Sequence, residues 1–321
     1  MDISVIVPIY GVEEYIENSL RSLFNQTKTD DVEFILINDC TKDMSMSLAR
    51  NVISDYSSLN IVIVDHEVNK GVAAARQNGL ALASGDYVIQ FDPDDWCESN
   101  MLKELYSCAL DNNADIVICD YYISNVNKNK YCQQLITSNN GLKCVEDMFK
   151  RRFNYGVWNK LVKRSLYVDN DISIVPNINM GEDLIFCAKI LCYAQNVVSL
   201  PKAYLHYVQN PNSLTATTKI SLKSIESIFA ALSEIEGFYR DRGFLDILQA
   251  SLNYRKVMVK YQLLMGVEKS LQKEYIKIFP EANGFIMKQT ALSFMKRVIV
   301  YLSTMGVLLP LNIVKSISKF K

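Results

Sequence analysis

Four consecutive residues, Asp92-Pro93-Asp94-Asp95, are the strongest sign of chemistry in this sequence, because they directly follow a strand-like apolar run at 87–91. Side chains two positions apart point to the same side of an extended chain, so Asp92 and Asp94 would lie together. Carboxylates crowded at a strand end repel one another unless a cation lies between them. Mg²⁺ or Mn²⁺, which prefer oxygen ligands, would fit there. The alternative is a proline-containing turn in which an aspartate caps a helix that begins near Ser99.

Three further positions carry side chains suited to a nucleotide or to proton transfer. Asp39 follows an apolar run and could accept hydrogen bonds from ribose hydroxyls or a base N–H, or it could be an Asx-turn residue. Arg76, one turn into a predicted helix of small residues, is either a donor fork for phosphate or carboxylate or a surface arginine beside an acid. Asp183, preceded by Glu182, is either a general base or an acid that stabilises a helix N-terminus.

The elements that would position these residues alternate along the first 125 residues. Apolar runs typical of strands are separated by stretches with apolar residues at helical spacing, and the strands are expected at 3–9, 32–37, 61–64, 87–91 and 116–121. Short, continuously apolar strands joined by helices predict an α/β fold with a mostly parallel sheet covered by helices on both faces. Polar residues at the carboxyl ends of its strands would line a ligand crevice.

The chain has 321 residues, which is more than one hydrophobic core usually supports. We therefore expect a main domain at 1–220 and a helical C-terminal module at 221–321. The polar stretch 125–140 predicts a loop or an edge hairpin. Apolar residues recur at helical spacing at 222–235 and 244–264, which predicts the first helices of the C-terminal module.

The segment 298–314 has no charged residue, is interrupted by Pro310 and is shorter than the about 20 apolar residues of a membrane span. Basic residues flank it on both sides. Three interpretations are open: a helix packed on the core or on a partner, a pair of helices lying on an anionic membrane, and a span, which fits least. The second predicts peripheral membrane contact through residues 288–321.

Composition excludes several classes of function. The 34 Lys and Arg against 35 Asp and Glu leave a formal charge of −1, which argues against a nucleic-acid partner. Eight cysteines without a C-x-x-C pair and two isolated histidines support neither a zinc site nor a disulfide framework. The first residues read as a strand, so we expect no secretory signal and a reducing cytoplasmic setting. A dehydrogenase-type nucleotide binder would need G-x-G-x-x-G after the first strand, where this chain has Pro8-Ile9-Tyr10-Gly11.

Taken in order, these segments resemble the family 2 glycosyltransferases with a GT-A fold. The resemblance covers about residues 1 to 215, and its motifs are SVIVPIY at 4–10, FILIND at 34–39, GVAAAR at 71–76, DPDD at 92–95, WNKL at 158–161 and GEDL at 181–184. It implies a GT-A, Rossmann-like sheet flanked by helices, with a helical C-terminal extension.

The resemblance also implies a role for each matching residue. On the donor side, it implies that Pro8 and Tyr10 border the nucleotide pocket and that Asp39 contacts the nucleoside. It places the diphosphate near Arg76 and the ribose or sugar at Asp92. It also implies that Asp94 binds Mn²⁺ or Mg²⁺. On the acceptor side, it implies Asp183 as the catalytic base with Glu182 beside it, and a nearby motif of Trp158, Asn159 and Lys160.

The activity implied by the resemblance is transfer of a hexose from a nucleotide diphosphate sugar, most often a UDP-sugar, to a saccharide or lipid-linked acceptor. The setting would be bacterial surface-polysaccharide or glycolipid assembly at the cytoplasmic face of the inner membrane. The Gln-x-x-Arg-Trp motif of processive synthases is absent, so we expect one sugar per encounter. Gly11, Asn38 and Cys40 depart from the usual residues, which leaves the donor base and sugar open. The alternative function is a catalytically inert, transferase-like scaffold that docks through its C-terminal helices. A homo-oligomer is compatible with the transferase and with the scaffold.

Overall fold

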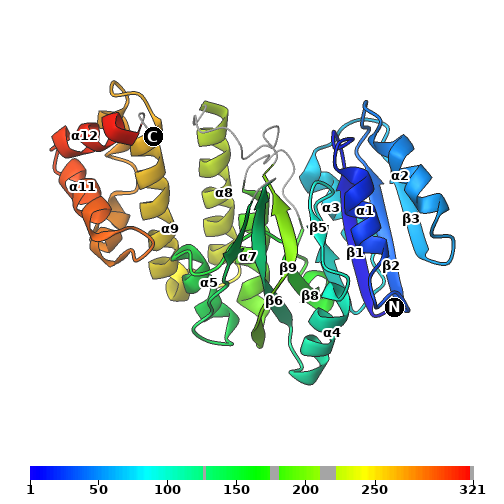
Figure 1. Cartoon of the computed structure of the whole chain (residues 1–321). Helices are drawn as coiled ribbons and strands as arrows, with labels where there is room; N and C mark the ends of the chain where they lie inside the picture. Colours follow the sequence, from blue (N-terminus) through cyan, green and yellow to red (C-terminus); the bar gives the residue numbers. More distant parts are fainter. Residues whose placement is uncertain (126–127, 174–180, 210–221, 319–321) are drawn as a thin grey trace.

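The computed structural model of the chain describes residues 1–125, 128–173, 181–209 and 222–318. Within these residues, nine strands form one mixed sheet in the order β3-β2-β1-β4-β8-β6-β9-β5, and β7 pairs with β6 (Figure 1). The strands are β1 (Ile3–Ile9), β2 (Val32–Asn38), β3 (Asn60–Asp65), β4 (Tyr87–Gln90), β5 (Trp96–Cys97), β6 (Ile116–Asn125), β7 (Lys128–Cys132), β8 (Lys160–Lys163) and β9 (Val197–Val208).

The first four strands are parallel and alternate with helices, as the sequence predicts. The helices that follow β1, β2 and β3 are α1 (Ile16–Phe24), α2 (Ser45–Ser54) and α3 (Val72–Leu82). Every residue of β1 is buried, because both faces of the strand are covered. Val5 and Val7 pack in a hydrophobic cluster with residues of α1, whereas Ile6 packs in a second cluster with residues of α3. The carboxyl ends of these strands therefore meet at one edge of the sheet.

The second half of the sheet is more mixed than the predicted, mostly parallel pattern. β8 is antiparallel to both β4 and β6, and β5 is antiparallel to β9, whereas β6 and β9 are parallel. The sequence pattern predicted neither β8 nor β9. β8 has only four residues, two of them lysines, and the middle of β9 includes the exposed Pro201 and Lys202. The predicted edge hairpin is confirmed in β6 and β7.

Helices cover the rest of the sheet and form the C-terminal region, at the opposite end of the molecule from β3 (Figure 1). Their bounds are α4 (Met101–Asp111), α5 (Gly141–Phe149), α6 (Ser165–Val168), α7 (Glu182–Tyr193), α8 (Leu222–Asp241), α9 (Leu245–Gly266), α10 (Gln272–Tyr275), the 3₁₀ helix η1 (Pro280–Lys288), α11 (Phe294–Thr304) and α12 (Leu309–Ser318). One hydrophobic cluster continues from α7 into α8 and α9. The predicted division at residue 220 lies outside the described residues, and the two-domain organisation stays a prediction.

The uncharged segment 298–314 is split between α11 and α12. Gly306, with φ +87°, lies between the two helices, and Pro310 occupies the first turn of α12, where no backbone N–H is needed. Ile299, Val300 and Leu311 are buried in a small core with η1 and α9. Over the part of the chain that the structure describes, no helix has the length and apolarity needed to cross a membrane.

Gly79 allows α3 to lie directly on β1. A Cβ atom at this position would lie 2.3 Å from Cγ2 of Ile6, which is closer than real Cβ contacts. We expect Gly79→Ala to lower the free energy of unfolding by about 1–3 kcal/mol, measured by urea denaturation, because the added methyl must displace a buried strand side chain. Gly237→Ala in α8 is the control. A Cβ there meets nothing within 4 Å, so we expect it to be neutral or to stabilise by about 0.5–1 kcal/mol. Equal changes in the free energy of unfolding in the two variants would contradict the close packing of α3 on β1.

Candidate active site

A buried arginine joins acidic residues from two other segments of the chain. The side chain of Arg76, on α3, is only 3% exposed. One terminal nitrogen donates to Asp92 Oδ1 at 2.7 Å, and the other donates to Asp183 Oδ1 and lies 3.6 Å from Glu182 Oε1. Arg76 and Asp183 are 107 positions apart in the sequence. The interpretation of Arg76 as a surface arginine is therefore wrong, because its acids are distant in sequence and the group is buried.

The elements bring these residues together for local reasons. Asp92 lies two residues after the end of β4, the parallel neighbour of β1. Glu182 and Asp183 form the first turn of α7, whose N-cap is Gly181 in the left-handed conformation at φ +98°. Glycine adopts this conformation without strain, and acids are favoured at a helix N-terminus by the unpaired N–H groups. Asp183 thus lies at a helix start, as one interpretation predicted, and also accepts from Arg76; its role as a general base stays a prediction.

Burial governs the ionisation of this cluster. Burial, together with the charge of Asp183, raises the pKa of Glu182 to about 7 against the opposing effect of Arg76. Burial likewise raises the pKa of Asp183, while Arg76 and the backbone N–H of Val157 favour its charged form. Burial opposes the charge of Arg76, but Asp183, Asp92 and Glu182 outweigh it and raise its pKa. The result is an arginine that is permanently charged beside acids that titrate unusually high.

The acidic loop that follows β4 is held by β9. The backbone N–H of Asp95 donates to Asp92 O at 3.1 Å, which closes the predicted turn. The side chain of Asp95 is buried and accepts from the N–H of Val208 at 2.8 Å. Burial raises the pKa of Asp95 well above its usual value, and the charges of Asp92 and Asp94 add to this effect. No aspartate of the loop caps α4, whose N-cap is Asn100.

The residues present fit a divalent cation that takes few ligands from the protein and most from a bound diphosphate or from water. Asp94 is half-buried, and its charge contributes, after burial and Glu14, to the raised pKa of Tyr15. Asp94 therefore lies beside the segment that follows β1. Asp95 Oδ2 is buried without a hydrogen-bond partner in the described structure. No group of three or more His, Cys, Asp or Glu within the described ranges could hold a metal alone. Mg²⁺ or Mn²⁺ would take one or two of these carboxylates and complete its shell with diphosphate oxygens or water.

Asp39 lies at the end of β2 and connects it to α3. Its Oδ1 accepts from Lys70 N–H at 2.8 Å, its Oδ2 accepts from Gly71 N–H at 2.8 Å, and His66 Nδ1 lies 2.8 Å from Oδ1. The side chain is buried. These bonds reach 27 to 32 positions along the chain, so Asp39 is not a local Asx-turn residue. Its contact with a nucleoside stays a prediction.

Pro8 and Tyr10 lie at the carboxyl end of β1, next to Asp39. The N–H of Asp39 donates to Ile9 O at 3.0 Å, which places the two strand ends side by side. Pro8 is buried, whereas the Tyr10 ring is 51% exposed. Gly11, where the family usually has asparagine, adopts φ +67°. Tyr10 is thus available to a ligand at this edge of the sheet.

The segment Trp158-Asn159-Lys160 lies in the interior and supports the loop before it. All three side chains are buried. Lys160 Nζ donates to Asn154 O at 2.8 Å, Gly156 O at 2.6 Å and Asn159 Oδ1 at 2.8 Å. These bonds fix the loop whose Val157 N–H reaches Asp183. The acceptor-side role of the segment stays a prediction, and the contacts observed are those of a support for Asp183.

Sequence reasoning missed the contacts of two histidines, of which His66 touches the site residue Asp39. His66 Nε2 lies 2.7 Å from Asn78 Nδ2, so the ring bridges Asp39 and α3. His206 stacks on Trp96 at 3.5 Å between ring centroids, and its Nε2 lies 3.0 Å from Glu98 Oε1. A signal for His66 was available, because it directly follows β3 at the edge where Asp39 lies.

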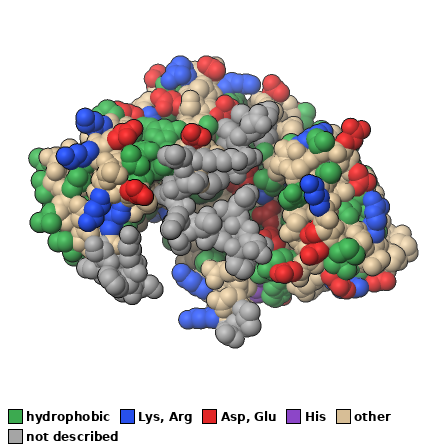
Figure 2. Space-filling model, turned by 90° about the horizontal axis from the view of Figure 1, so that it is seen from above, with side chains coloured by type: hydrophobic (Ala, Val, Ile, Leu, Met, Phe, Trp, Pro, Cys, Tyr) green, Lys and Arg blue, Asp and Glu red, His purple; other side chains and the backbone are tan. Residues whose placement is uncertain are grey.

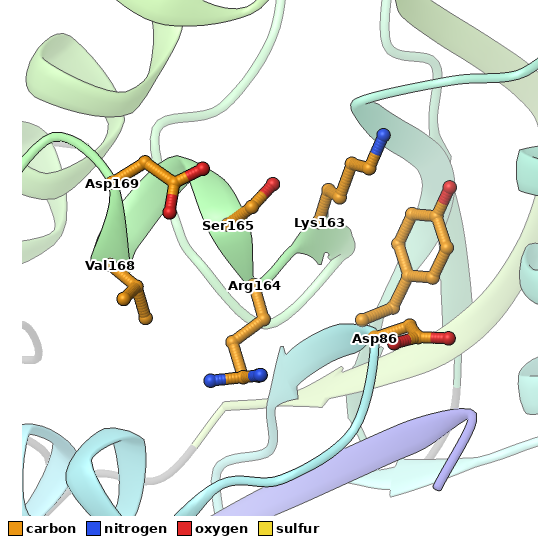
Figure 3. Close-up of a pocket in the computed structure, with 7 residues that line it drawn as sticks. Asp86, Lys163, Arg164, Ser165, Val168 and Asp169 are labelled. Atoms are coloured by element: carbon orange, nitrogen blue, oxygen red, sulfur yellow. The ribbon is translucent and has the colours of Figure 1, made fainter.

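Acidic side chains are visible near the middle of the face shown in Figure 2. A separate pocket of about 260 Å³ lies at the other end of β4. It is lined by Asp86, Lys163, Arg164, Ser165 and Asp169, which Figure 3 shows around the start of the strand. Because Asp92 follows the opposite end of β4, this pocket takes no part in the acidic cluster.

Comparison with known proteins identifies the family. Residues 4–169 match the model of glycosyl transferase family 2. The uncharacterized glycosyltransferase EpsJ of Bacillus subtilis is 32% identical over 219 residues, which are 66% of this chain and 62% of EpsJ. The cholesterol galactosyltransferase of Borreliella burgdorferi is 29% identical over 74% of this chain and 71% of that protein. The structure of S. aureus TarS residues 1–349 with UDP-GlcNAc has a TM-score of 0.70 at 21% identity, covering 99% of this chain and 92% of that 1–349 chain. The α/β fold is thus GT-A-like with a helical C-terminal region, and the chain belongs to glycosyl transferase family 2.

Proposed function

We propose that the chain is an inverting, non-processive glycosyltransferase. It moves one sugar from a nucleotide diphosphate sugar, a UDP-sugar, to a hydroxyl of a saccharide or lipid-linked acceptor at the cytoplasmic face of a bacterial membrane. The observation that carries the proposal is the meeting of Arg76, Asp92 and Asp183 in one buried cluster. The complex of TarS with UDP-GlcNAc supports the donor class, and the name of the cholesterol galactosyltransferase supports a lipid acceptor.

In the proposed reaction, Asp183 accepts the proton of the acceptor hydroxyl. The hydroxyl oxygen forms a bond to the anomeric carbon, the bond from that carbon to the diphosphate breaks, and the electron pair leaves with the nucleoside diphosphate. Attack from the face opposite the leaving group inverts the anomeric configuration. Arg76 orients Asp183 and keeps it ionised against the effect of burial. A divalent cation held by Asp94, when bound, supplies positive charge to the diphosphate.

The pH profile follows from the raised pKa values of the acids. A general base must be ionised, so kcat/KM falls as pH drops below the pKa of the Glu182 and Asp183 pair. Because burial raises the pKa of Asp183, and the pKa of the neighbouring Glu182 is raised to about 7, we expect the acidic limb at a higher pH than an ordinary aspartate would give. Glu182→Gln removes one charge and moves the limb to lower pH. Profiles of kcat/KM against pH at saturating Mn²⁺, for the wild type and for Glu182→Gln, test this. Acidic limbs at the same pH in both proteins would contradict an interaction between Glu182 and Asp183.

Donor hydrolysis tests the proposed reaction most directly. The purified chain is incubated with UDP-, GDP- and TDP-sugars and Mn²⁺, and release of the nucleoside diphosphate is measured. We expect one UDP-sugar to be hydrolysed slowly, and we expect Asp94→Asn to abolish the release. Asp111→Asn, which changes an exposed acid of α4, is the control and should match the wild type. Failure to bind any nucleotide sugar with Mn²⁺ would favour the inert scaffold.

A further inference from the structure

Large hydrophobic side chains are exposed in a group on α11, α12 and the turn between them. Seven of the twenty large hydrophobic residues exposed in the described parts of the chain lie within positions 294–313; they are Phe294, Met295, Tyr301, Met305, Val307, Leu309 and Ile313. We call these seven residues the 294–313 patch. The other thirteen are spread over the preceding 293 positions. Single exposed hydrophobic residues are normal, whereas a group of this kind marks an interaction surface.

α11 is apolar on two faces. Ile299, Val300 and Ser303 are buried against the small C-terminal core. On the opposite side, Phe294 is 66% exposed, Tyr301 43% and Met305 65%. These three lie seven and four positions apart, so they share one face of the helix. A helix packed only on its own protein would have polar residues on that face, and here the face needs a second apolar environment.

The charge of the segment that carries the patch has one sign. From residue 282 to residue 321 the sequence has no Asp or Glu, and its basic residues are Lys288, Lys296, Arg297, Lys315, Lys319 and Lys321. The remaining 281 residues have 28 Lys and Arg against 35 Asp and Glu, a formal charge of −7. In Figure 2, hydrophobic side chains reach the surface beside Lys and Arg at the end of the molecule that contains α11 and α12.

We propose that the 294–313 patch docks the protein on an anionic lipid bilayer, with α11 and α12 lying in the interface. The apolar side chains would enter the boundary between headgroups and acyl chains, and Lys288 and Lys296 would contact anionic headgroups. A second copy of this chain fits less well, because both copies would bring the same basic segment, which has no acid, to the contact. The proposal is independent of the sugar transfer, although it would bring the enzyme to lipid-linked acceptors.

Co-sedimentation with vesicles tests the proposal. The full chain is mixed with vesicles of phosphatidylcholine alone or of phosphatidylcholine and phosphatidylglycerol. We expect binding to the mixed vesicles that falls as salt rises. The triple variant Phe294→Ser, Met295→Ser, Leu309→Ser should bind at least about tenfold more weakly, because burial of apolar surface is lost. Lys288→Gln with Lys296→Gln should weaken binding by about fivefold for each charge removed.

The control is a triple variant of equally exposed hydrophobic residues elsewhere, Val68→Ser, Leu82→Ser and Leu110→Ser, which should bind like the wild type. Donor hydrolysis by the patch variant should equal that of the wild type, so failure of the docking and failure of the transferase proposal are distinguishable. The proposal is overturned if the wild type prefers neither vesicle, or if the control loses as much binding as the patch variant. A dimer that the patch variant abolishes, without vesicle binding by the wild type, would assign the surface to a second copy instead.

Discussion

Replacing Asp183 with asparagine is expected to reduce turnover by about 10²–10⁴-fold, the usual contribution of a general base. Asparagine keeps an oxygen that can accept from Arg76, so the geometry of the cluster is conserved, but its amide cannot take the acceptor proton. Donor binding should change little, because the proposed donor contacts come from other residues. Steady-state transfer with the best donor of the hydrolysis screen measures the effect, and a nucleotide-sugar titration measures the affinity.

A matched control for this variant is Asp241→Asn, at the end of α8, where the carboxylate is exposed. It should retain full turnover. Turnover that is undiminished in Asp183→Asn would remove the base assignment, and a loss of donor affinity equal to the loss of turnover would move Asp183 to donor binding.

Replacing Arg76 with methionine is expected to lower the free energy of unfolding by about 3–5 kcal/mol, because removal of one partner leaves buried charges uncompensated. Asp92 and Asp183 lose their direct donors, and Glu182 loses the cation that opposes its raised pKa. Urea denaturation at pH 8 measures the loss. Arg21→Met is the control: Arg21 is bonded to Glu17 and Asp55 at the surface and is 42% exposed, so its loss should cost less than about 1 kcal/mol.

The stability of the Arg76 variant should also depend on pH in a defined direction. Without the guanidinium, the pKa values of Glu182 and Asp183 rise further above those of the unfolded chain. A carboxyl whose pKa is raised on folding stabilises the folded state at low pH, and this contribution disappears as pH rises through the folded pKa. The difference from the wild type should therefore be largest above pH 7 and shrink toward pH 5. A difference below about 1 kcal/mol at pH 8 would show that the cluster is not a closed buried network.

The strands that carry the site could be predicted from the sequence because they are buried on both faces. The predicted runs 3–9, 32–37 and 61–64 correspond to β1, β2 and β3 within one residue at each end. Such strands are continuously apolar, and turns bound them. β8 and β9 were not predicted, because β8 is short and β9 has a bulge where it pairs with β6. The pairing of β8 and β9 with their neighbours depends on contacts between segments more than 30 positions apart.

The chemistry of the site was predicted in part. The aspartates that follow β4 and the acid pair at the start of α7 were recognised from type and position, since local rules govern strand ends and helix starts. The local rules left two alternatives for Asp39 and for Arg76. Tertiary contacts exclude one alternative for each: Asp39 bonds to Lys70 and Gly71 and is no local Asx-turn residue, and Arg76 is buried and is no surface arginine. Their contacts with a nucleotide stay predictions.

The sequence by itself determined the alternating α/β pattern of the N-terminal half, the motifs that identify the family, and the absence of acids after residue 281. These depend on residue type and short spacing, which act locally. Only the tertiary structure decided that Arg76 pairs with Asp183, that Lys160 supports the loop beside Asp183, and that α11 exposes an apolar face. Each of these depends on how segments far apart in the chain pack together and on which groups the packing removes from water.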